Sequence, residues 1–368
     1  MKIRDIRLHV PPDLPLSQSI DVAWAPGAPW STADRAFVEV QTDEGITGWG
    51  PPVEEPLLRT AIAPYLVGKD PFAVERNISV LRQAGGGWAL EVALWDIIGK
   101  ACGQPLYRLW GGYTDRIRAY SSCMEPSSGE QRAEDALRRY EENWRAIKLR
   151  IHGWTVAEDV RQVEKVREAA GDRMEIMVDA NQAQLPGTVQ PAPGPVWDFQ
   201  RALDTARELQ RLGVCWLEEP LDRYDWEGLA KLCEAVEIPI AGGENNVGLH
   251  EFRWMIERDV YDIIQPECHK SDGISQIRKI AALAEMHRKP VVPHHGRDGF
   301  GFLAHLHLLA SIPNASHVEI FNEPPGYPAQ VFQNVLAEPL LPDDNGDILL
   351  PQKPGLGVEP HPDLLKAK

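Results

Sequence analysis

Three short segments decide how this chain folds: Met177-Val178-Asp179-Ala180-Asn181, Trp216-Leu217-Glu218-Glu219-Pro220 and Ala241-Gly242-Gly243-Glu244-Asn245. In each segment an apolar run ends in an acidic residue, and Asp179, Glu218 and Glu244 are 39 and 26 positions apart along the chain. This spacing is about that of one strand followed by one helix. In a barrel of parallel strands the equivalent strand ends meet at one rim, so the three carboxylates are expected to converge.

Three carboxylates buried side by side repel one another strongly unless a positive charge holds them together. A cluster made only of carboxylate oxygens suits a hard divalent cation, and magnesium is the ion that we expect. The sequence therefore predicts one Mg²⁺ per subunit, bound by Asp179, Glu218 and Glu244, in a metal-assisted enzyme.

The composition is that of a globular protein with room for a barrel and a smaller domain. The chain has 368 residues, of which 43% are hydrophobic and 25% are charged. Its net charge of −16 argues against nucleic acid as a partner, because a phosphate backbone requires clustered Lys and Arg. An anionic small substrate remains compatible with this charge, because a bound cation inverts the sign locally.

Signals for export or membrane insertion are missing from the sequence. No apolar run is long enough to span a membrane, and the first residues alternate like a strand instead of forming the apolar core of a signal peptide. The five cysteines are odd in number and scattered, as is typical of a reducing compartment. We therefore expect a cytoplasmic protein with no membrane partner and no zinc site.

Residues 1–115 predict an α+β domain. Residues 2–9 alternate like a strand, and residues 36–42 and 46–50 flank an Asp-Glu-Gly turn, which is a hairpin signal. Residues 11–30, rich in Pro and Trp, are interpreted as a long loop and a candidate lid. Helical periodicity covers residues 56–67, 75–82 and 89–101.

Residues 116–325 predict a barrel. Alternating strand and helix signals are typical of parallel βα units, and eight of them close a (β/α)8-type barrel of the α/β class. Residues 183–197 form a Pro-rich insert expected at the catalytic rim, and residues 326–368 are expected to pack back against the first domain. The eight apolar runs lie at residues 117–123, 146–151, 174–178, 214–217, 238–242, 261–265, 290–293 and 317–321.

Further reactive residues follow the other predicted strands. The second strand ends in Lys148 and Arg150, which alternation places on the same side, facing the barrel interior. The sixth is followed by Glu267, the seventh by His294, and the eighth contains Glu319. A pair of cations aimed at a three-carboxylate site is what a negatively charged substrate would require opposite the metal.

The order of these strand-end residues resembles that of the enolase superfamily and, within it, the mandelate racemase subgroup. Nearly the whole chain takes part, including Ala93-Leu94-Trp95-Asp96 in the first domain and Gly355-Leu356-Gly357 in the tail. The resemblance implies a modified TIM barrel with an α+β N-terminal capping domain that the C-terminal tail completes. It also implies a homo-oligomer that acts on a small carboxylate, here a sugar acid.

The resemblance implies a role for each strand-end residue. The three carboxylates would bind magnesium, His294 would be a general base paired with Glu267, and Glu319 would hydrogen-bond a substrate carboxylate oxygen as the enolate forms. Two positions depart from the subgroup. Arg150 replaces the second lysine of a Lys-x-Lys pair, and Glu267 stands where Asp is more common.

The departure at Arg150 separates the possible reactions. A proton next to a carboxylate is weakly acidic, and magnesium stabilises the second negative charge that its removal creates. Arginine keeps its proton and makes a poor base, whereas racemisation needs an acid/base group on each face of the carbon. We therefore predict a dehydratase of an aldonate or aldarate, in which His294 removes the α-proton and then protonates the departing hydroxyl.

Alternatives remain open at this point. A racemase or epimerase, or a lactone cycloisomerase, would use the same enolate with Lys148 as the second acid/base group. Lys148 could equally serve only to neutralise the substrate carboxylate. A barrel that binds metal and ligand without turnover is a further alternative, although it would have no need of a His294–Glu267 pair.

Four residues near the strand ends are candidates for substrate contacts. Asn181 could touch the substrate or a metal-bound water, or only form a turn. His295 could contact the substrate or only shape its loop, and Arg297 is a rim candidate for substrate hydroxyls. Trp24 could close over the substrate or pack within the cap. Glu219 is interpreted as structural or as a residue that contacts the metal ligands from behind, because neighbouring side chains on a strand point in opposite directions.

Overall fold

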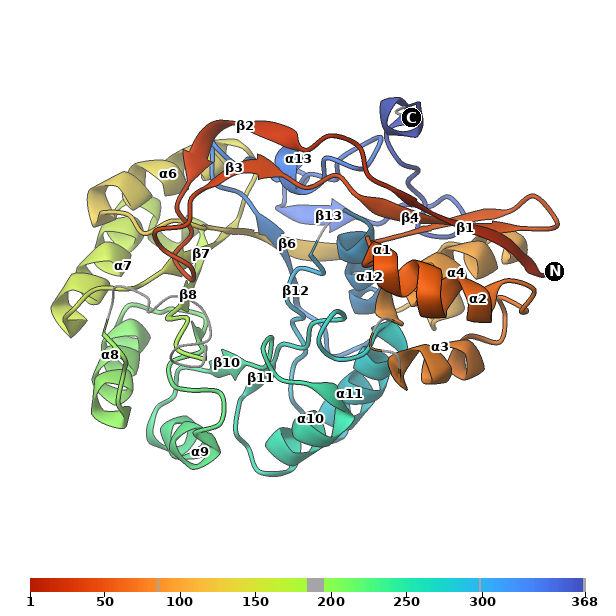
Figure 1. The fold of residues 1–368 in the computed structure, drawn as a ribbon. Coiled ribbons are helices and arrows are strands. Elements are labelled where there is room, and N and C mark those ends of the chain that lie inside the picture. The colour runs from red at the N-terminus through yellow and green to blue at the C-terminus, as the bar shows by residue number, and fades with distance from the viewer. Residues whose placement is uncertain (84, 86, 184–194, 298, 367–368) are drawn as a thin grey trace.

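The computed structural model describes residues 1–366 of the chain, apart from residues 84, 86, 184–194 and 298. Within these residues a central ring of parallel strands is surrounded by helices, and the N-terminal segment crosses one end of the ring (Figure 1). The predicted rim insert at residues 183–197 lies almost entirely outside the described residues.

Seven of the eight predicted runs form strands of one sheet, in the order β11-β10-β9-β8-β7-β6-β12. These strands pair in parallel, so their carboxyl ends lie at the same rim. Their bounds are β6 (Arg116–Ser122), β7 (Ala146–Arg150), β8 (Glu175–Asp179), β9 (Leu217–Glu218), β10 (Ile240–Gly242), β11 (Ile263–Ile264) and β12 (His317–Phe321).

The seventh predicted run closes the ring through isolated bridges. Val291 bridges to Ile264 on one side and to Ala315 on the other, between β11 and β12. Pro290 and Pro293 flank this position, and because proline has no N–H, a longer ladder does not form there. The prediction of a (β/α)8-type barrel is confirmed.

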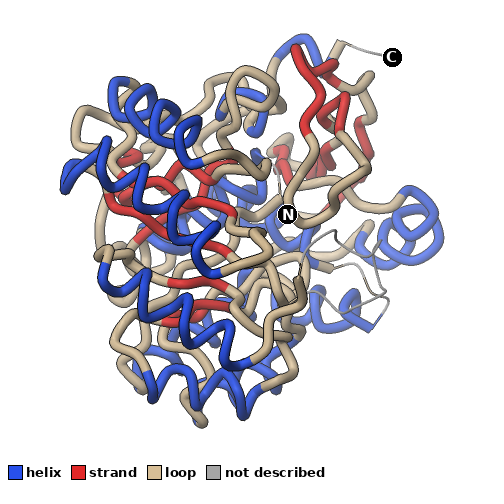
Figure 2. The backbone as a smooth tube through the Cα atoms, turned by 90° about the vertical axis from the view of Figure 1, so that its left-hand side faces the viewer, coloured by secondary structure: helices blue, strands red, loops and turns tan. Residues whose placement is uncertain are grey.

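Helices lie outside the strands in the described part of the chain (Figure 2). Several begin at a residue whose side chain accepts a hydrogen bond from a backbone N–H of the first turn, as Ser128 and Asp198 do. All five residues of β7 are buried, because side chains fill the ring and helices cover it. The barrel helices are α6 (Gly129–Glu141), α7 (Val156–Ala170), α8 (Phe199–Arg211), α9 (Trp226–Ala235), α10 (Gly248–Glu257), α11 (Ile274–Met286) and α12 (Gly299–Leu309).

The first domain has the predicted α+β character. β1 (Ile3–His9), β4 (Phe37–Thr42) and β5 (Thr47–Gly50) form an antiparallel sheet that includes the predicted hairpin. A Cβ atom on Gly48 would lie 2.1 Å from the Ala93 carbonyl oxygen, so glycine allows this sheet to approach a helix closely. The helices are α1 (Glu55–Leu57), a π-helical turn (Leu58–Ile62), α2 (Ala63–Leu66), α3 (Val74–Gln83), α4 (Trp88–Cys102) and α5 (Leu106–Leu109).

The prediction of a long loop at residues 11–30 was wrong. This segment contains β2 (Leu14–Ile20), which pairs antiparallel with β3 (Trp30–Ala33) in a two-stranded hairpin. Pro15 obscures the strand pattern in the sequence, yet an edge strand tolerates proline. The hairpin crosses the end of the ring, where the Ala23 amide donates a 2.8 Å hydrogen bond to the Met124 carbonyl just beyond β6 (Figure 1).

The C-terminal tail contacts both domains. β13 (Asp347–Leu349) pairs antiparallel with β6 of the barrel, a pairing that the sequence did not indicate. The Leu356 amide donates a 2.8 Å hydrogen bond to Asp96 on α4 and so links the tail to the first domain. The tail also contains α13 (Ala329–Phe332) and a 3-10 turn (Pro362–Leu365). A division after residues 115 and 325 remains our proposal for the domain boundaries.

Among the described residues, no helix combines the length and the apolar character that crossing a membrane requires. No disulfide joins any of the five cysteines.

Candidate active site

A cavity of about 530 Å³ lies at the carboxyl ends of the barrel strands, against the β2–β3 hairpin. The predicted site residues that line it are Trp24, Arg150, Asn181, Glu244, His294, His295 and Arg297. The remaining predicted residues are buried: Lys148, Asp179, Glu218, Glu267 and Glu319. All of them lie within, end or follow barrel strands, apart from Trp24, which the hairpin contributes.

The strand register explains why the acidic residues are neighbours. Arg150 on β7 pairs with Asp179 on β8, and Asp179 pairs with Glu218 on β9. Glu218 is in turn the partner of Ala241 on β10, and Glu244 follows three residues later. Parallel pairing in register therefore brings together carboxylates that are far apart in the sequence.

Lys148 is buried among these carboxylates. Its Nζ lies 2.7 Å from Glu218 Oε1, 2.8 Å from Glu319 Oε1 and 3.6 Å from Asp179 Oδ2. Burial alone disfavours its charge, but the nearby Glu218 and Glu319 carboxylates raise the pKa of Lys148 above its ordinary value. Lys148 is therefore held as an ammonium ion, and it is not among the residues that line the cavity.

Arg150 lies between the carboxylates and the cavity. Its guanidinium contacts Asp179, donates 2.8 Å and 3.1 Å hydrogen bonds to the Cys123 carbonyl and the Ser122 hydroxyl, and lies 4.9 Å from the centre of the Trp24 ring. The planar fork of an arginine is needed to reach these separate partners at once. The second-strand cation that faces the cavity is consequently one that keeps its proton.

Two further side chains hold Glu218. Gln265 Nε2 donates to Glu218 Oε2 at 2.8 Å, and Trp216 Nε1 donates to the same oxygen at 3.1 Å. Both residues neighbour strand ends in the sequence, yet we did not predict either of them as part of the site. For Trp216, alternation toward the barrel interior was the signal, because it precedes Glu218 by two positions in one extended run.

Glu219 does not point away from the site as strand alternation suggests, and its contacts fit the second of our two interpretations, a residue that lies behind the predicted ligands. Its φ of +47° is in the left-handed region, which ends the strand and breaks the alternation. Asn245 Nδ2 lies 2.9 Å from Glu219 Oε1 and 3.1 Å from Glu244 Oε1. Burial, together with the charges of Glu244 and Asp179, raises the pKa of Glu219 well above its ordinary value.

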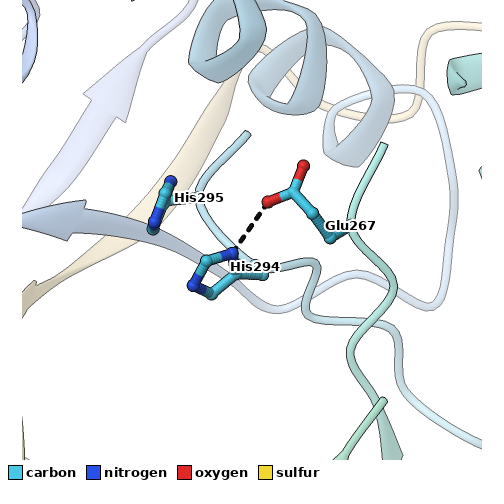
Figure 3. A group of neighbouring side chains, drawn as sticks. All are labelled: Glu267, His294 and His295. Carbon is cyan, nitrogen blue, oxygen red and sulfur yellow. Dashed lines mark hydrogen bonds and ion pairs between the residues drawn. The ribbon is translucent and has the colours of Figure 1, made fainter. Parts of the chain in front are cut away.

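His294 and Glu267 form the predicted pair. His294 Nδ1 lies 2.7 Å from Glu267 Oε2, and the other ring nitrogen, Nε2, lies 3.2 Å from Glu244 Oε2 (Figure 3). Burial lowers the pKa of His294, but Glu244 and Glu267, with Glu319, raise it to about 9. Because Glu244 has the largest raising effect, a cation that neutralises Glu244 lowers this pKa.

His295 packs beside the pair. Its Nδ1 accepts a 2.8 Å hydrogen bond from the Arg297 amide, and its ring lies 3.8 Å from that of His294 and 4.2 Å from that of Phe321 between centres. Figure 3 shows it alongside His294, on the side away from Glu267. Burial lowers the pKa of His295 well below its ordinary value, so this imidazole is neutral.

The remaining candidates for substrate contacts are at the cavity wall. Asn181 has a φ of +48°, and its side-chain oxygen lies 3.3 Å from Arg150 Nη1 and 3.1 Å from His152 Nε2. Trp24 stacks on Phe321 with 5.4 Å between ring centres. Arg297 is exposed at the rim. The structure therefore allows all three to meet a substrate.

Lys270 is a cavity residue that we did not predict. It lines the cavity, and its ammonium contacts the Asn245 side chain, which in turn contacts Glu244. Lys270 is three residues after Glu267, in the loop after the sixth strand. Its position in that loop is the feature of the sequence from which Lys270 could have been predicted as a site residue.

The charge and chemistry of the strand-end residues fit a divalent cation. Five buried carboxylates outnumber the buried Lys148 and Arg150 at the strand ends; the five are Asp179, Glu218, Glu219, Glu244 and Glu319. Burial and the charge of Glu218 raise the pKa of Asp179 to about 7, as expected where negative charge is in excess. Glu219 Oε2 is buried with no hydrogen-bond partner among the described residues. Oxygen ligands in such a site suit magnesium.

The three predicted ligands are not in a closed ligand shell in this arrangement. Among the described residues, the groups whose His, Cys, Asp or Glu ligand atoms all lie within 4.8 Å of one another are Glu267–His294–His295 and Glu267–Cys268–His305. Lys148 and Arg150 contact Asp179 instead, and Glu244 contacts His294. In the first of the two groups, a hydrogen bond between His294 and Glu267 explains why these two side chains lie so close together.

Known proteins are similar to the chain over most of its length. Residues 131–364 match the enolase C-terminal domain-like family, and residues 21–111 match the mandelate racemase / muconate lactonizing enzyme N-terminal domain. The L-talarate/galactarate dehydratase of Salmonella typhimurium is 33% identical over 273 residues, which are 71% of this chain and 64% of that enzyme. The D-galactarolactone cycloisomerase of Agrobacterium fabrum is 30% identical over 401 aligned positions, 99% of this chain and 98% of that enzyme.

A solved structure has the same architecture. It is a mutant of L-talarate/galactarate dehydratase liganded with Mg and L-glucarate, with a TM-score of 0.83 and 27% identity. The match covers 100% of this chain and 91% of that one. The chain is therefore an enzyme and belongs to the enolase superfamily, in its mandelate racemase subgroup.

Proposed function

We propose that the protein is a magnesium-dependent dehydratase of a sugar acid, an aldonate or an aldarate. The observation that carries this proposal is the asymmetry of the cavity. A histidine with a carboxylate partner lines the cavity, whereas the second-strand residue there is Arg150, and Lys148 is buried behind it. Elimination needs one competent acid/base group, and the cavity offers one in His294.

Each group has a role in this proposal. Asp179, Glu218 and Glu244 would hold the magnesium ion, which supplies stabilisation of the negative charge that develops on the substrate carboxylate. Lys148 and Arg150 would offset the remaining charge, and Glu319 would hydrogen-bond a carboxylate oxygen. The Mg-liganded relative with L-glucarate supports both the ion and a sugar acid substrate.

His294 would move both protons. Its Nδ1–H donates to Glu267, so Nε2 is the atom that takes the α-proton. The proton removed leaves an electron pair on the substrate as an enolate. When the C3–OH bond breaks, the same Nε2–H donates to the departing hydroxyl, which leaves as water. The enol that remains tautomerises to a 2-keto-3-deoxy acid.

An epimerase or a lactone cycloisomerase is the alternative. It would begin with the same proton abstraction. The similarity of the chain to D-galactarolactone cycloisomerase supports this alternative. An epimerase requires Lys148 to return a proton from the opposite face. The three carboxylates within 3.6 Å of Lys148 Nζ hold that proton on the lysine, and Lys148 does not line the cavity, so both observations argue against its transfer to a substrate.

The experiment is a screen of aldonates and aldarates with the purified protein and magnesium, with 2-keto acid formation as the readout. Keto product that disappears when the metal is chelated supports the proposal. If no acid gives product, the same panel in deuterated water decides between the alternatives. Exchange of the α-proton without elimination indicates an epimerase or cycloisomerase, and no exchange with any acid contradicts a sugar acid as substrate.

We also propose that the enzyme is a cytoplasmic homo-oligomer. The absence of disulfides among its five cysteines is compatible with a reducing compartment. Assembly rests on the resemblance to the subgroup, and sedimentation of the purified protein tests it.

A further inference from the structure

Behind the His294–Glu267 pair lies a histidine that the proposed reaction does not use. His305 is on α12 and is 1% exposed. Its Nδ1 lies 2.6 Å from the His294 carbonyl oxygen, and its Nε2 lies 3.3 Å from the Cys268 amide nitrogen. One imidazole therefore joins the main chain just after Glu267 to the main chain of His294.

The groups around His305 determine where its proton lies. A backbone N–H only donates, so Nε2 must accept from Cys268, and Nδ1 must carry the proton that is donated to the His294 carbonyl. Burial lowers the pKa of His305, which agrees with a neutral ring. The Glu267 carboxylate therefore pairs with His294, whose Nδ1 lies 2.7 Å from Glu267 Oε2. His305 Nε2 is farther away, 4.0 Å from Glu267 Oε1.

Two glycines allow α12 to come this close. A Cβ atom on Gly301 would lie 1.8 Å from the carbonyl oxygen of Gly296, which is two residues after His294. Gly296 itself has a φ of +81°, where a side chain is unfavourable. His305 follows Gly301 by one helical turn, so both are on the face that packs against the segment carrying the base.

Glu267 depends on the same two segments. Its Oε1 accepts a 3.2 Å hydrogen bond from the His269 amide, and its Oε2 accepts a 3.1 Å hydrogen bond from the Gly296 amide. A glutamate has one more rotatable bond than the aspartate that is more common at this position in the subgroup, so it needs these restraints more. A relative shift of the two segments would move both ends of the pair.

We propose that His305 is a positioning residue, which holds the segments after the sixth and seventh strands at the separation that the Glu267–His294 hydrogen bond requires. The inference rests on the proposed function for one point, that His294 transfers the proton.

Cys268 Sγ lies 3.2 Å from Glu267 Oε1, but the His305 nitrogen nearest to them already accepts from an amide. Hydrogen bonds therefore account for this cluster without a metal.

His307 provides a matched control on the same helix. It is also fully buried, its Nδ1 accepts a 3.2 Å hydrogen bond from the Tyr107 amide, and its Nε2 lies 3.0 Å from the Leu356 carbonyl oxygen. It thus joins two main-chain segments as His305 does, but these belong to the first domain and the tail. A merely structural role predicts the same result at both positions.

The test compares His305→Leu and His305→Gln with His307→Leu in the full-length enzyme with magnesium. Hydrogen-bonding partners that orient an active-site group typically affect activity 10–100-fold, so we expect His305→Leu to lower kcat by about that factor with KM changed less than about twofold. His305→Gln retains one donor and one acceptor and should recover most of the loss. His307→Leu should lower the melting temperature and leave kcat within about twofold.

A second readout needs no substrate and separates this inference from the proposed function. Hydrogen–deuterium exchange should increase in residues 266–270 and 292–297 of His305→Leu, and not in those of His307→Leu. If no sugar acid reacts but this exchange pattern appears, the proposed function fails and the positioning role stands. Equal kcat and equal exchange in the two leucine variants, or no recovery with glutamine in a folded protein, would overturn the inference.

Discussion

Two clusters of buried charges lie at the same rim of the barrel, and they differ in balance. Around Glu323, just after β12, two arginines face two carboxylates: Arg132 lies 2.7 Å from Glu323 and 3.0 Å from Asp135, and Arg139 lies within 4.0 Å of both. In the cavity cluster, five carboxylates outnumber Lys148 and Arg150. Burial opposes ionisation in both, yet the pKa of Glu323 is lowered by Arg132, whereas the pKa of Asp179 is raised to about 7.

The difference separates a structural cluster from a functional one. Both oxygens of Glu323 accept hydrogen bonds, from Arg132 and from the Met124 and Glu125 amides. A cluster in which buried arginines balance the buried carboxylates stabilises one conformation without a bound cation. An excess of buried negative charge instead costs stability in the metal-free protein, and it creates affinity for a cation. Substitutions in the two clusters should therefore have opposite profiles of activity and stability.

The largest expected effect is at the base. His294→Asn removes the proton acceptor, so kcat for keto acid formation should fall by about 10⁴-fold. With magnesium present the variant should remain folded and still be stabilised by the ion, because the three predicted carboxylate ligands are unchanged. Activity assays with matched thermal melts check this, and activity within tenfold of the parent enzyme would contradict the assignment of His294.

The next effect is in the balanced cluster. Glu323→Gln leaves two buried arginines facing Asp135, and breaking a buried ion pair by removing one partner typically costs about 3–5 kcal/mol in the free energy of unfolding. The catalytic groups are untouched, so kcat of the folded protein should change less than about threefold. Urea unfolding measures the loss, and His294→Asn serves as the control that loses activity without stability.

The third effect is a pH dependence of the metal-free protein. The folded-state pKa of Asp179, about 7, is above its ordinary value of 3.8, so folded protein binds the proton more tightly than unfolded protein. This contribution to stability is full below about pH 4 and is lost as the pH rises through about 7, by an amount on the order of 4 kcal/mol. Glu219, whose pKa is also raised, acts in the same direction.

Magnesium should reverse this trend, because it favours the ionised carboxylates. Unfolding measured from pH 4 to pH 8 with and without magnesium should show a gain that grows with pH. In the metal-free Glu219→Gln variant, the free energy of unfolding should fall less as the pH rises. A gain from magnesium that is constant over this range would contradict the charge imbalance.

The smallest effect concerns the departure from the subgroup. Arg150→Lys cannot reach Asp179, Ser122 and the Cys123 carbonyl together, so we expect kcat for dehydration to fall by about tenfold. A lysine at the cavity would also offer an acid/base group on the second face. Recovered substrate in deuterated water should therefore contain the epimer, and its absence would show that Lys148, rather than residue 150, sets the reaction outcome.

Much of the site could be predicted because it lies where strands end. An apolar run of strand length followed by Asp179, Glu218 or Glu244 can be recognised in the sequence, and parallel pairing brings such ends together. The expected direction of the Glu219 side chain was wrong because alternation holds only while the backbone stays extended, and its φ of +47° breaks it. The β2–β3 hairpin was missed because Pro15 interrupts the strand pattern.

The sequence by itself determined the kind of fold, the family resemblance and the choice of residues that we propose as the acid/base pair, because these depend on local periodicity and on residue order. Only the tertiary structure decided that Lys148 is buried while Arg150 faces the cavity, that Glu219 joins the carboxylates, and that His305 supports the base. Each of these depends on contacts between segments distant along the chain, and on how closely they pack. Such distances follow from the packing of the whole barrel, which no local pattern encodes.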